Sequence, residues 1–417
     1  MNFIKKLLIS IIIVGALLFS VVTKTAQAGN PYWNVQSIDT VKYSRDLARE
    51  KVSDSEFDET INEQISQIAK SGATHVAIGT PYDDEFLPFL YRWVKAARNN
   101  NLNVWFRGNF SGWEGWFGYE SINREEHKML VESYILSNTD LFEDGDIFTP
   151  CTECENGGPG DPRETGDVLG YRNFLIDEYR VAEGTFKKIG KDVRANYFSM
   201  NGDVAYLVMD KKTADVLGGV VVIDHYVDNP EELLEDIKRI KERSGGNVML
   251  GEFGAPIPDI HGEMTEYEQA IWLDSALSEL SKVDGLVGIN YWTSFGGTTS
   301  IWNSDGSDKS AVAVLTGYFS PQELQGKVIN ELGHPIKNVL ILANSKIAET
   351  DKAGIYTILI VPSTDKVFVK KDGYKEKLLS IRDLENSGEI VLEKVNEGIF
   401  FEFQKWVYST FRKILNN

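Results

Sequence analysis

Two glutamates stand where apolar stretches of the sequence end. Glu252 follows residues 248–251, and Glu153 follows residues 145–150. Each stretch predicts a buried strand that presents a carboxylate at the edge where a sheet meets solvent. A pair of carboxyl groups can cleave a glycosidic bond, one as proton donor to the leaving oxygen and the other as nucleophile or as base to a water molecule. For either residue alone, a solvated side chain without chemical role is the alternative.

Glu153 lies between the only two cysteines of the chain, Cys151 and Cys154. In an exported protein a C-x-x-C pair can close a local disulfide, which would stiffen the loop that carries Glu153. Free thiols are one alternative, and a metal or redox site is another, although no further zinc ligands and no helix start are evident nearby. Glu155 is the alternative acid/base, because residues two apart share one face of a strand.

Short apolar runs alternate with helical patterns from residue 35 to about residue 320. Strands are expected within residues 35–46, 74–80, 103–109, 145–149, 192–197, 219–226, 247–253 and 285–292. Helices are expected at residues 57–71, 85–99, 123–136, 171–189, 204–209, 230–243 and 265–282. This α/β alternation predicts a parallel sheet closed into a (β/α)8 TIM barrel over residues 29–320. An open doubly wound sheet is the rival, but the glycine-rich phosphate turn typical of it is missing after the first strand.

Further polar side chains fall at the C-terminal ends of the expected strands, the face on which barrel active sites are built. Random placement would scatter them along the chain. The residues expected at this face, besides the two glutamates, are Arg107, Asn109, Asn196, His225, Tyr226, Asn290 and Trp292.

Several aromatic side chains could stack on sugar rings. Trp113 and Trp116 lie in a glycine-rich loop after the third strand and are expected to form a cleft wall, whereas Trp105 lies within a strand and is expected in the core. The remaining candidates are Trp33, Phe117, Tyr119, Trp292 and Trp302.

Of the five histidines, only His225 is given a functional role. His75 lies within an expected buried strand and is predicted to be a core residue with satisfied hydrogen bonds. His127, His261 and His334 are predicted at the surface.

Composition narrows the choice of partner. The chain has 417 residues, enough for one large and one smaller domain, and a formal net charge of −19 that becomes about −22 without three lysines of the leader. Such acidity disfavours nucleic acid or an anionic membrane as the main partner, so a neutral ligand such as a carbohydrate fits better.

The first 28 residues predict a secretory signal peptide. Lys5 and Lys6 precede the apolar run 7–22, and the small-residue pattern Ala26-Gln27-Ala28 predicts cleavage after Ala28. An uncleaved N-terminal anchor is the alternative. Either way, the protein is expected to be secreted or displayed at the cell surface.

The composition changes near residue 320. Residues 323–395 alternate in polarity, with glycine, asparagine and aspartate between short runs, which predicts a small all-β sandwich. This module resembles the carboxypeptidase regulatory-like domain through residues 326–329, 335–339 and 354–356, a likeness that implies no chemistry. Residues 396–417 predict an amphipathic helix that packs on a domain or docks weakly on a membrane or partner.

The barrel resembles the glycoside hydrolases of clan A, which include the family 5 cellulases and mannanases. In that clan the acid/base ends strand 4 and the nucleophile ends strand 7, the places of Glu153 and Glu252. The likeness extends to Arg107, near the clan's arginine that contacts the nucleophile, to His225 and Tyr226 on strand 6, and to Trp292 under the sugar. Thr152 departs from the clan, which usually has asparagine before its acid/base.

The resemblance implies a retaining glycoside hydrolase without a cofactor or metal. Glu252 would act as nucleophile and Glu153 as acid/base, with their carboxyl groups about 5 to 5.5 Å apart. Arg107 and Tyr226 are expected to keep Glu252 ionised, whereas the apolar setting of Glu153 is expected to raise its pKa. A non-catalytic glycan-binding protein on a decayed barrel and a transglycosylase with the same residues are the alternatives.

Overall fold

The computed structural model describes residues 30–395, which form an α/β barrel and a small β domain. The predicted leader, residues 1–28, and the predicted C-terminal helix, residues 396–417, lie outside the described residues. Among the helices that are described, none combines the length and the apolar character needed to cross a membrane.

An eight-stranded parallel sheet forms the centre of the barrel, in the order β4-β3-β2-β1-β8-β7-β6-β5. It closes because residues 192–194 pair with β4, through Gly145 N to Asp192 O at 2.9 Å and Phe148 N to Arg194 O at 2.9 Å. The strands are β1 (Val35–Asp39), β2 (His75–Ile78), β3 (Asn103–Phe106), β4 (Ile147–Phe148), β5 (Ser199–Asn201), β6 (Val220–Asp224), β7 (Asn247–Phe253) and β8 (Leu286–Tyr291). The predicted TIM barrel is confirmed.

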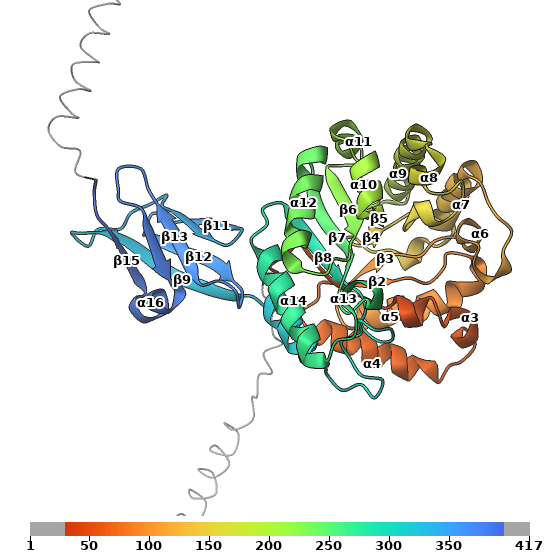
Figure 1. Cartoon of the computed structure of the whole chain (residues 1–417), viewed down its shortest axis with the longest axis horizontal. Coiled ribbons are helices and arrows are strands. Elements are labelled where there is room, and N and C mark those ends of the chain that lie inside the picture. Colours follow the sequence, from red (N-terminus) through yellow and green to blue (C-terminus); the bar gives the residue numbers. More distant parts are fainter. Residues whose placement is uncertain (1–29, 396–417) are drawn as a thin grey trace, which may run out of the picture. The chain divides into compact units, whose positions relative to one another are not determined.

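Helices surround the sheet (Figure 1). Their apolar faces and the outer face of the sheet share one continuous core, as the two-layer arrangement of a barrel requires. The longer helices are α4 (Phe57–Lys70), α5 (Leu87–Asn99), α7 (Arg124–Ser137), α9 (Val168–Ile189), α12 (Pro230–Ser244), α14 (Glu266–Ser281) and α15 (Ser310–Phe319). The shorter ones are α2 (Val41–Ser44), α3 (Ala48–Lys51), α6 (Ser111–Glu114), α8 (Pro162–Thr165), α10 (Gly202–Val208), α11 (Lys211–Val216) and α13 (Pro258–His261).

Several element boundaries differ from the prediction by a few residues, and two of these differences bear on the site. The first strand ends at Asp39, and residues 41–44, which were expected to continue it, form α2. The fifth strand lies at Ser199–Asn201, whereas the predicted segment 192–197 contributes only an isolated bridge at Arg194. The shift changes which side chain reaches the C-terminal end of this strand.

Apolar side chains fill the barrel interior, so the barrel is a packed core and not a channel. This plug takes one side chain from nearly every strand or its adjoining segment, and its members are fully or almost fully buried. They are Val35, Ala77, Trp105, Ile147, Tyr197, Val222 and Met249, with Val220 and Val287 packed against them.

The smaller domain follows the barrel in the chain. It consists of a four-stranded and a three-stranded sheet, whose neighbouring strands are mostly antiparallel, and it has a hydrophobic core of its own. Its strands alternate buried and exposed residues, as in β12 and β13, because one face of each sheet is solvated. They are β9 (Gln322–Asn330), β10 (Leu340–Ala343), β11 (Lys346–Glu349), β12 (Ile355–Ile360), β13 (Lys366–Lys370), β14 (Lys377–Ser380) and β15 (Glu389–Leu392), and α16 (Ile381–Ser387) joins the last two. The predicted all-β domain is confirmed.

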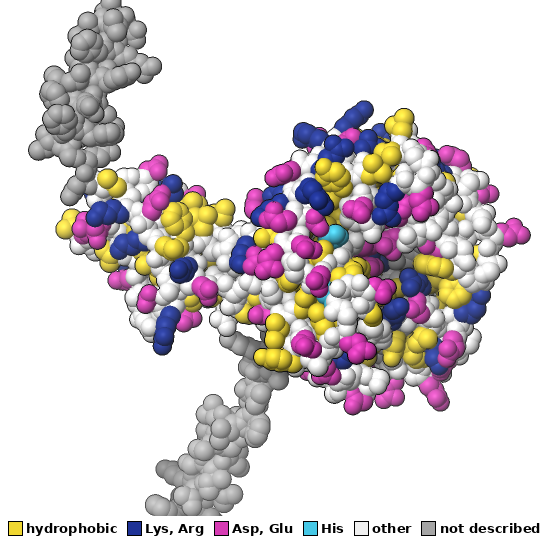
Figure 2. All heavy atoms as spheres, viewed as in Figure 1, with side chains coloured by type: hydrophobic (Ala, Val, Ile, Leu, Met, Phe, Trp, Pro, Cys, Tyr) yellow, Lys and Arg dark blue, Asp and Glu magenta, His cyan; other side chains and the backbone are white. Residues whose placement is uncertain are grey.

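Acidic side chains are spread over the face of the molecule shown in Figure 2, with basic ones interspersed among them. This distribution agrees with the formal net charge of −19 for the whole chain.

Candidate active site

A layer of polar side chains lies above the apolar plug, and the two-residue period of a strand explains it. A residue two positions after a plug residue points to the same side of the sheet, one step nearer the C-terminal end. Trp105 is therefore followed by Arg107, Val222 by Asp224, and Tyr197 by Ser199. The guanidinium carbon of Arg107 lies 5.1 Å from the ring centre of Trp105, directly on the plug.

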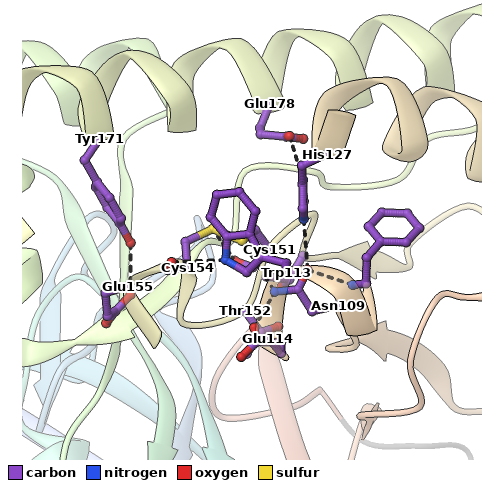
Figure 3. Close-up of a disulfide and its surroundings, with 12 residues drawn as sticks. Asn109, Trp113, Glu114, His127, Cys151, Thr152, Cys154, Glu155, Tyr171 and Glu178 are labelled. Atoms are coloured by element: carbon purple, nitrogen blue, oxygen red, sulfur yellow. Dashed lines mark hydrogen bonds and ion pairs between the residues drawn. A yellow bond between two sulfur atoms is a disulfide. The ribbon is translucent and has the colours of Figure 1, made fainter. Parts of the chain in front are cut away.

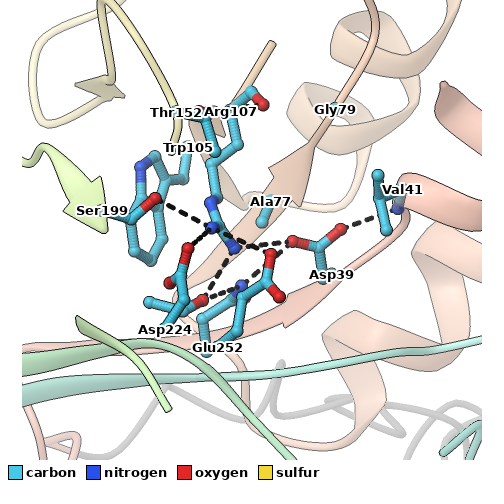
Figure 4. Close-up of polar contacts among 12 residues, drawn as sticks. Asp39, Val41, Ala77, Gly79, Trp105, Arg107, Thr152, Ser199, Asp224 and Glu252 are labelled. Carbon is cyan, nitrogen blue, oxygen red and sulfur yellow. Dashed lines mark hydrogen bonds and ion pairs between the residues drawn. The ribbon is translucent and has the colours of Figure 1, made fainter. Parts of the chain in front are cut away.

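Arg107 is the centre of this layer (Figure 4). Its guanidinium is almost fully buried and reaches Asp39 on β1 at 3.0 Å, Asp224 on β6 at 3.0 Å and Glu252 on β7 at 3.1 Å. It also donates to the Ser199 hydroxyl at 3.1 Å and to the Gly251 carbonyl oxygen at 2.7 Å. One cation thus links the ends of four strands to β3, and it contacts Glu252 as expected.

A β-bulge at Gly251 aims Glu252 into the pocket. Ile223 pairs with Leu250, but Asp224 pairs with Glu252, so one extra residue stands on β7. Bulges of this kind redirect side chains and are frequent beside active sites. A Cβ atom at Gly251 would lie 2.3 Å from Asp224 Oδ1, so only glycine fits there.

The Gly251 carbonyl turns inward at the bulge and is held from two sides. It accepts from Arg107 and, at 2.8 Å, from the side-chain amide of Asn290 on β8. Asn290 also donates to Asp39 Oδ2 at 3.1 Å and is fully buried. Asn290 therefore supports the polar layer from below and does not line the pocket.

Glu252 is hydrogen-bonded through both carboxylate oxygens. Arg107 contacts Oε1, and the Tyr226 hydroxyl donates to Oε2 at 2.8 Å, which agrees with the expected roles of both residues. Both contacts lower the pKa of Glu252, but burial together with the charges of Glu153 and Asp39 raises it to about 7. Arg107 and Tyr226 thus favour the ionised form of Glu252, as expected, but desolvation outweighs them and the net shift of its pKa is upward.

Glu153 lies in the loop after β4, with backbone angles φ 44° and ψ 52°. Few residues other than glycine adopt this left-handed conformation, and where they do, the surrounding structure must hold them there. The Glu153 amide donates to Ser199 O at 3.0 Å, and a disulfide joins Cys151 to Cys154 on either side. The Asn156 side chain donates to Glu153 Oε2 at 3.1 Å.

Burial is the main cause that raises the pKa of Glu153, and the charge of Glu155 raises it further. Arg107 and Arg45 act in the opposite direction. A carboxyl group with a raised pKa remains protonated closer to neutral pH, which is the state a proton donor needs.

Glu155 points away from the pocket, because the chain turns after Glu153 and does not continue as a strand. Its carboxylate accepts from the Tyr171 hydroxyl at 2.9 Å and from the Asn201 amide at 2.7 Å. Only 4% of the residue is exposed. Glu155 therefore ties the loop to α9 and β5, and the geometry favours Glu153 as the partner of Glu252.

The pocket at the C-terminal end of the barrel has a volume of about 270 Å³. Carboxylate oxygens of Glu153, Asp224 and Glu252 lie within 4.8 Å of one another beside it. Three acids at such distances resemble a cation site, but the Arg107 guanidinium already bridges Asp224 and Glu252. The pocket lining consists of Asp39, Val41, Arg45, Gly79, Arg107, Glu114, Trp116, Thr152, Glu153, Asn156 and Glu252.

Asn109 and His127 form part of a buried network behind the pocket (Figure 3). Asn109 is fully buried and lies outside the pocket lining, contrary to the expectation that it contacts a ligand. His127, predicted at the surface, is also fully buried, between Glu178 Oε1 at 2.7 Å and Asn109 Oδ1 at 2.9 Å. The prediction failed because α7 turns this one polar side chain inward. His75 is buried as expected, beside Thr74 and Gly145.

Two further predicted site residues lie outside the pocket. Asn196 donates to Leu217 O at 2.9 Å, before β6 begins, because the fifth strand lies further along the chain than predicted. Ser199 takes the place expected for Asn196. His225 is turned toward α12, with Nε2 2.8 Å from Asp236 Oδ2.

The two tryptophans expected in the cleft wall lie in different environments. Trp116 lines the pocket, with the guanidinium carbon of Arg45 5.0 Å from its ring centre. Trp113 is a core residue instead, since it stacks on Phe174 at 5.0 Å and donates to Cys154 O at 3.1 Å.

Trp292 lies next to Tyr226, with ring centres 5.9 Å apart, and its peptide bond to Thr293 is cis. It is not among the residues that line the pocket. Trp33 and Trp302 are buried in the core, like Trp105, and cannot stack on a ligand.

Among the site residues that sequence reasoning missed, four carry polar groups close to the two glutamates or line the pocket: Asp39, Glu114, Ser199 and Asp224. For Asp39 and Asp224 a signal existed, because each lies an even number of residues after a buried apolar strand position. Ser199 depended on the position of the fifth strand. Glu114 ends the four-residue helix α6, which is too short for a periodic pattern to predict the direction of a side chain.

Comparison with known proteins finds similarity in structure but not in sequence. No family model matches the chain, and no curated protein matches it. A solved structure of GH5_18 from Bifidobacterium longum subsp. longum superposes with a TM-score of 0.51 at 16% identity, covering 72% of this chain and 85% of that one. This similarity shows that the two share the barrel fold.

Two more distant structural matches are a family 5 xyloglucanase from Paenibacillus pabuli and β-glucuronidase 3 from Bacteroides uniformis. The first has a TM-score of 0.46 at 14% identity over 61% of this chain and 89% of that one. The second has a TM-score of 0.45 at 13% identity over 80% of this chain, which spans about half (47%) of the glucuronidase chain.

Proposed function

We propose that the protein is a retaining glycoside hydrolase that cleaves β-glycosidic bonds in an oligo- or polysaccharide. The observation that carries the proposal is the approach of Glu153 and Glu252 across the pocket, with carboxylate oxygens within 4.8 Å. Retaining enzymes hold their two carboxyl groups about 5 to 5.5 Å apart, whereas inverting ones leave roughly 6.5 to 9.5 Å for a water molecule. The short separation therefore favours attack by a carboxylate over attack by water.

In the first step, Glu252 attacks the anomeric carbon and a glycosyl ester forms. The bond from this carbon to the leaving oxygen breaks, and Glu153 gives its proton to that oxygen. In the second step, Glu153 takes a proton from a water molecule, which attacks the same carbon and releases Glu252 as a carboxylate.

The surroundings of the two glutamates support these roles. Arg107 and Tyr226 bind the charged form of Glu252, whose pKa of about 7 allows a large ionised fraction at neutral pH. Glu153 has no ion pair in the described structure and a raised pKa, as a proton donor requires. The structural relatives named above include a protein called a xyloglucanase, and a glycan substrate is consistent with them.

Two features bear on where the enzyme acts. Residues 1–28 have the pattern of a signal peptide, so export to the cell exterior or surface is part of the proposal. The β domain, which resembles a carboxypeptidase regulatory-like module, is proposed to be a non-catalytic spacer. Weak membrane association through the leader or through residues 396–417 belongs to the same proposal.

The test is hydrolysis of a panel of β-linked glycans and aryl β-glycosides by the wild type and by Glu252→Gln. Turnover by the wild type, its loss in Glu252→Gln, and a first-formed product of the substrate's own β configuration in proton NMR would support the proposal. Binding without turnover by the wild type would favour a non-catalytic glycan-binding protein. Transfer of sugar to an acceptor in place of water would identify a transglycosylase.

A further inference from the structure

Glu114 is a third glutamate in the pocket, and the two-step reaction makes no use of it. It ends α6 and lines the pocket together with Glu153, Trp116 and Asn156, on the side formed by the loops after β3 and β4. Within residues 30–395, the carboxyl group of Glu114 accepts a hydrogen bond only from Asn109, whose Nδ2 lies 2.5 Å from Glu114 Oε1. The other oxygen, Oε2, is left for a ligand.

A chain of buried residues fixes the direction of that hydrogen bond (Figure 3). The backbone N–H of Phe110 donates to Asn109 Oδ1 at 2.8 Å, so this atom is the amide oxygen. His127 Nε2 lies 2.9 Å from the same oxygen and must therefore carry a proton. The Asn109 Nδ2 group is left to donate to Glu114, and Glu178 holds the far side of His127 at 2.7 Å.

This arrangement decides which oxygen of Glu114 can carry a proton. Oε1 accepts from Asn109, so a proton on the carboxyl group of this pocket-lining residue lies on Oε2. Burial raises the pKa of Glu114 to about 8, and the charges of Glu153 and Glu155 act in the same direction, whereas the hydrogen bond from Asn109 and the charge of Arg45 act against them. At neutral pH the group is mainly neutral and presents an O–H donor.

Each link of the buried chain from Glu178 through His127 and Asn109 to Glu114 is made, although Glu178 Oε2 has no partner among the described residues. Hydrogen bonds of such a buried chain strengthen one another and hold the end group in place. The end group of this chain is the carboxyl group of Glu114, which lines the pocket beside Glu153, the proposed proton donor, and forms no ion pair among the described residues. A rigid O–H donor suits a hydroxyl or ring oxygen of an uncharged sugar. A cationic amino sugar would instead require the ionised carboxylate.

We propose that Glu114 is a substrate-binding residue that donates a hydrogen bond, as a neutral carboxylic acid, to an oxygen of an uncharged sugar unit bound beside Glu153. Asn109 is the positioning residue for this contact, with His127 and Glu178 behind it. The inference rests on the proposed function, because it takes the pocket ligand to be a glycan, and it narrows the substrate to neutral hexose or pentose units on this side of the pocket.

The variants Glu114→Gln and Glu114→Ala test the protonation state directly. Glutamine resembles the neutral acid: its oxygen can accept from Asn109 while its NH2 group donates into the pocket. Both changes are made in the Glu252→Gln background, so that sugars bind without turnover and the titration of Glu252 is removed. Glu120→Gln, an exposed position in the following loop, is the matched control.

The probes are cello-, xylo-, manno- and galacto-oligosaccharides and a glucosamine oligomer, with Kd measured by calorimetry at pH 6.5 and pH 9. At pH 6.5 we expect Glu114→Ala to weaken binding of the best neutral oligosaccharide roughly 10- to 50-fold and Glu114→Gln by no more than about threefold. Between pH 6.5 and pH 9, binding should weaken in the protein that keeps Glu114, because its carboxyl group ionises. It should not weaken in the Glu114→Gln variant, whose amide does not titrate. Circular dichroism of each variant establishes that it is folded.

Three results would overturn the inference: equal losses for glutamine and alanine, no loss for alanine, or tightest binding of the glucosamine oligomer. Failure of every probe to bind would overturn it as well, since Glu114 would then have no sugar ligand. Binding of a probe that the wild type never hydrolyses would contradict the proposed function alone.

Discussion

Arg107 and Glu252 lie 145 residues apart in the sequence, yet the guanidinium of one contacts the carboxylate of the other at 3.1 Å in the barrel mouth. The contact is possible because β3 and β7 lie on opposite sides of a closed sheet and both end at the same face. Four carboxyl groups influence the pKa of Arg107, those of Asp39, Asp224, Glu252 and Glu153, and Arg107 forms ion pairs with the first three of them. Its loss should therefore affect stability as well as activity.

Replacement of Arg107 by methionine keeps the length of the side chain but leaves buried acids without a counter-charge. We expect Arg107→Met to lower the free energy of unfolding by roughly 3–5 kcal/mol, the usual cost of breaking a buried ion pair. Urea denaturation measures it. Arg49→Met is the control, because Arg49 forms an exposed pair with Glu85 and its replacement should change stability far less. Equal effects of the two substitutions would refute the central position of Arg107.

Tyr226 lowers the pKa of Glu252 through a 2.8 Å hydrogen bond. Tyr226→Phe removes this bond, so the pKa of Glu252 rises above its present value of about 7 and the acid limb of the kcat/KM profile moves to higher pH. At pH 6 the loss in kcat/KM should be roughly 10- to 100-fold, and it should shrink at higher pH. Tyr171→Phe, which removes a similar bond from Glu155, should leave the acid limb in place.

Matched glutamine variants distinguish the roles of Glu153 and Glu155. Glu153→Gln should reduce kcat/KM roughly 100- to 10,000-fold for substrates with poor leaving groups and far less for activated aryl glycosides, which need no protonation. Glu155→Gln removes a charge that raises the pKa of Glu153, so its pKa falls and the basic limb of the profile moves to lower pH.

The exposed Glu164→Gln serves as the control for both glutamine variants and should not change the pH profile. A loss of activity in Glu155→Gln as large as that in Glu153→Gln, for poor leaving groups only, would make Glu155 the acid/base.

Gly251→Ala should disturb the bulge that aims Glu252. The new Cβ would lie 2.3 Å from Asp224 Oδ1, so we expect a loss of roughly 1–3 kcal/mol in unfolding free energy and at least a tenfold drop in kcat/KM. Gly184→Ala, on α9, is the control: no atom lies within 4 Å of its new Cβ, and it should stabilise by about 0.5–1 kcal/mol. A Gly251→Ala variant with wild-type kinetics would show that the bulge does not position Glu252.

The barrel was predictable because its signal is repeated. Each of the short apolar runs needs a second layer of structure, and helical patterns between them leave a parallel sheet as the solution. Boundaries were less predictable where the pattern is weak. The segment around Asn196 has no clear apolar run, so the sequence predicts the fifth strand several residues too early, and Ser199 stands where Asn196 is expected.

The residues of the candidate site were predictable only where they lie at the end of a strand. Glu252 lies in β7, and Arg107 and Tyr226 come shortly after β3 and β6; their contacts agree with the prediction. Trp113 and Glu114 on the short helix α6 and His127 on α7 could not be placed, since the burial of a single helical side chain depends on packing across the fold. The pKa of Glu252 is a further case, because no sequence pattern reports how deeply a carboxylate is desolvated.

The most direct test of the account is to trap the glycosyl ester on Glu252. A 2-deoxy-2-fluoro glycoside with a good leaving group, built on the sugar that the wild type hydrolyses best, slows the second step so that the ester accumulates. Peptide mass spectrometry should then find the fluorosugar on the peptide that contains Glu252, and no label in Glu252→Gln. A label on another residue, or turnover of the glycan with inversion at the anomeric carbon, would contradict the assignment of Glu252 as the nucleophile of a retaining enzyme.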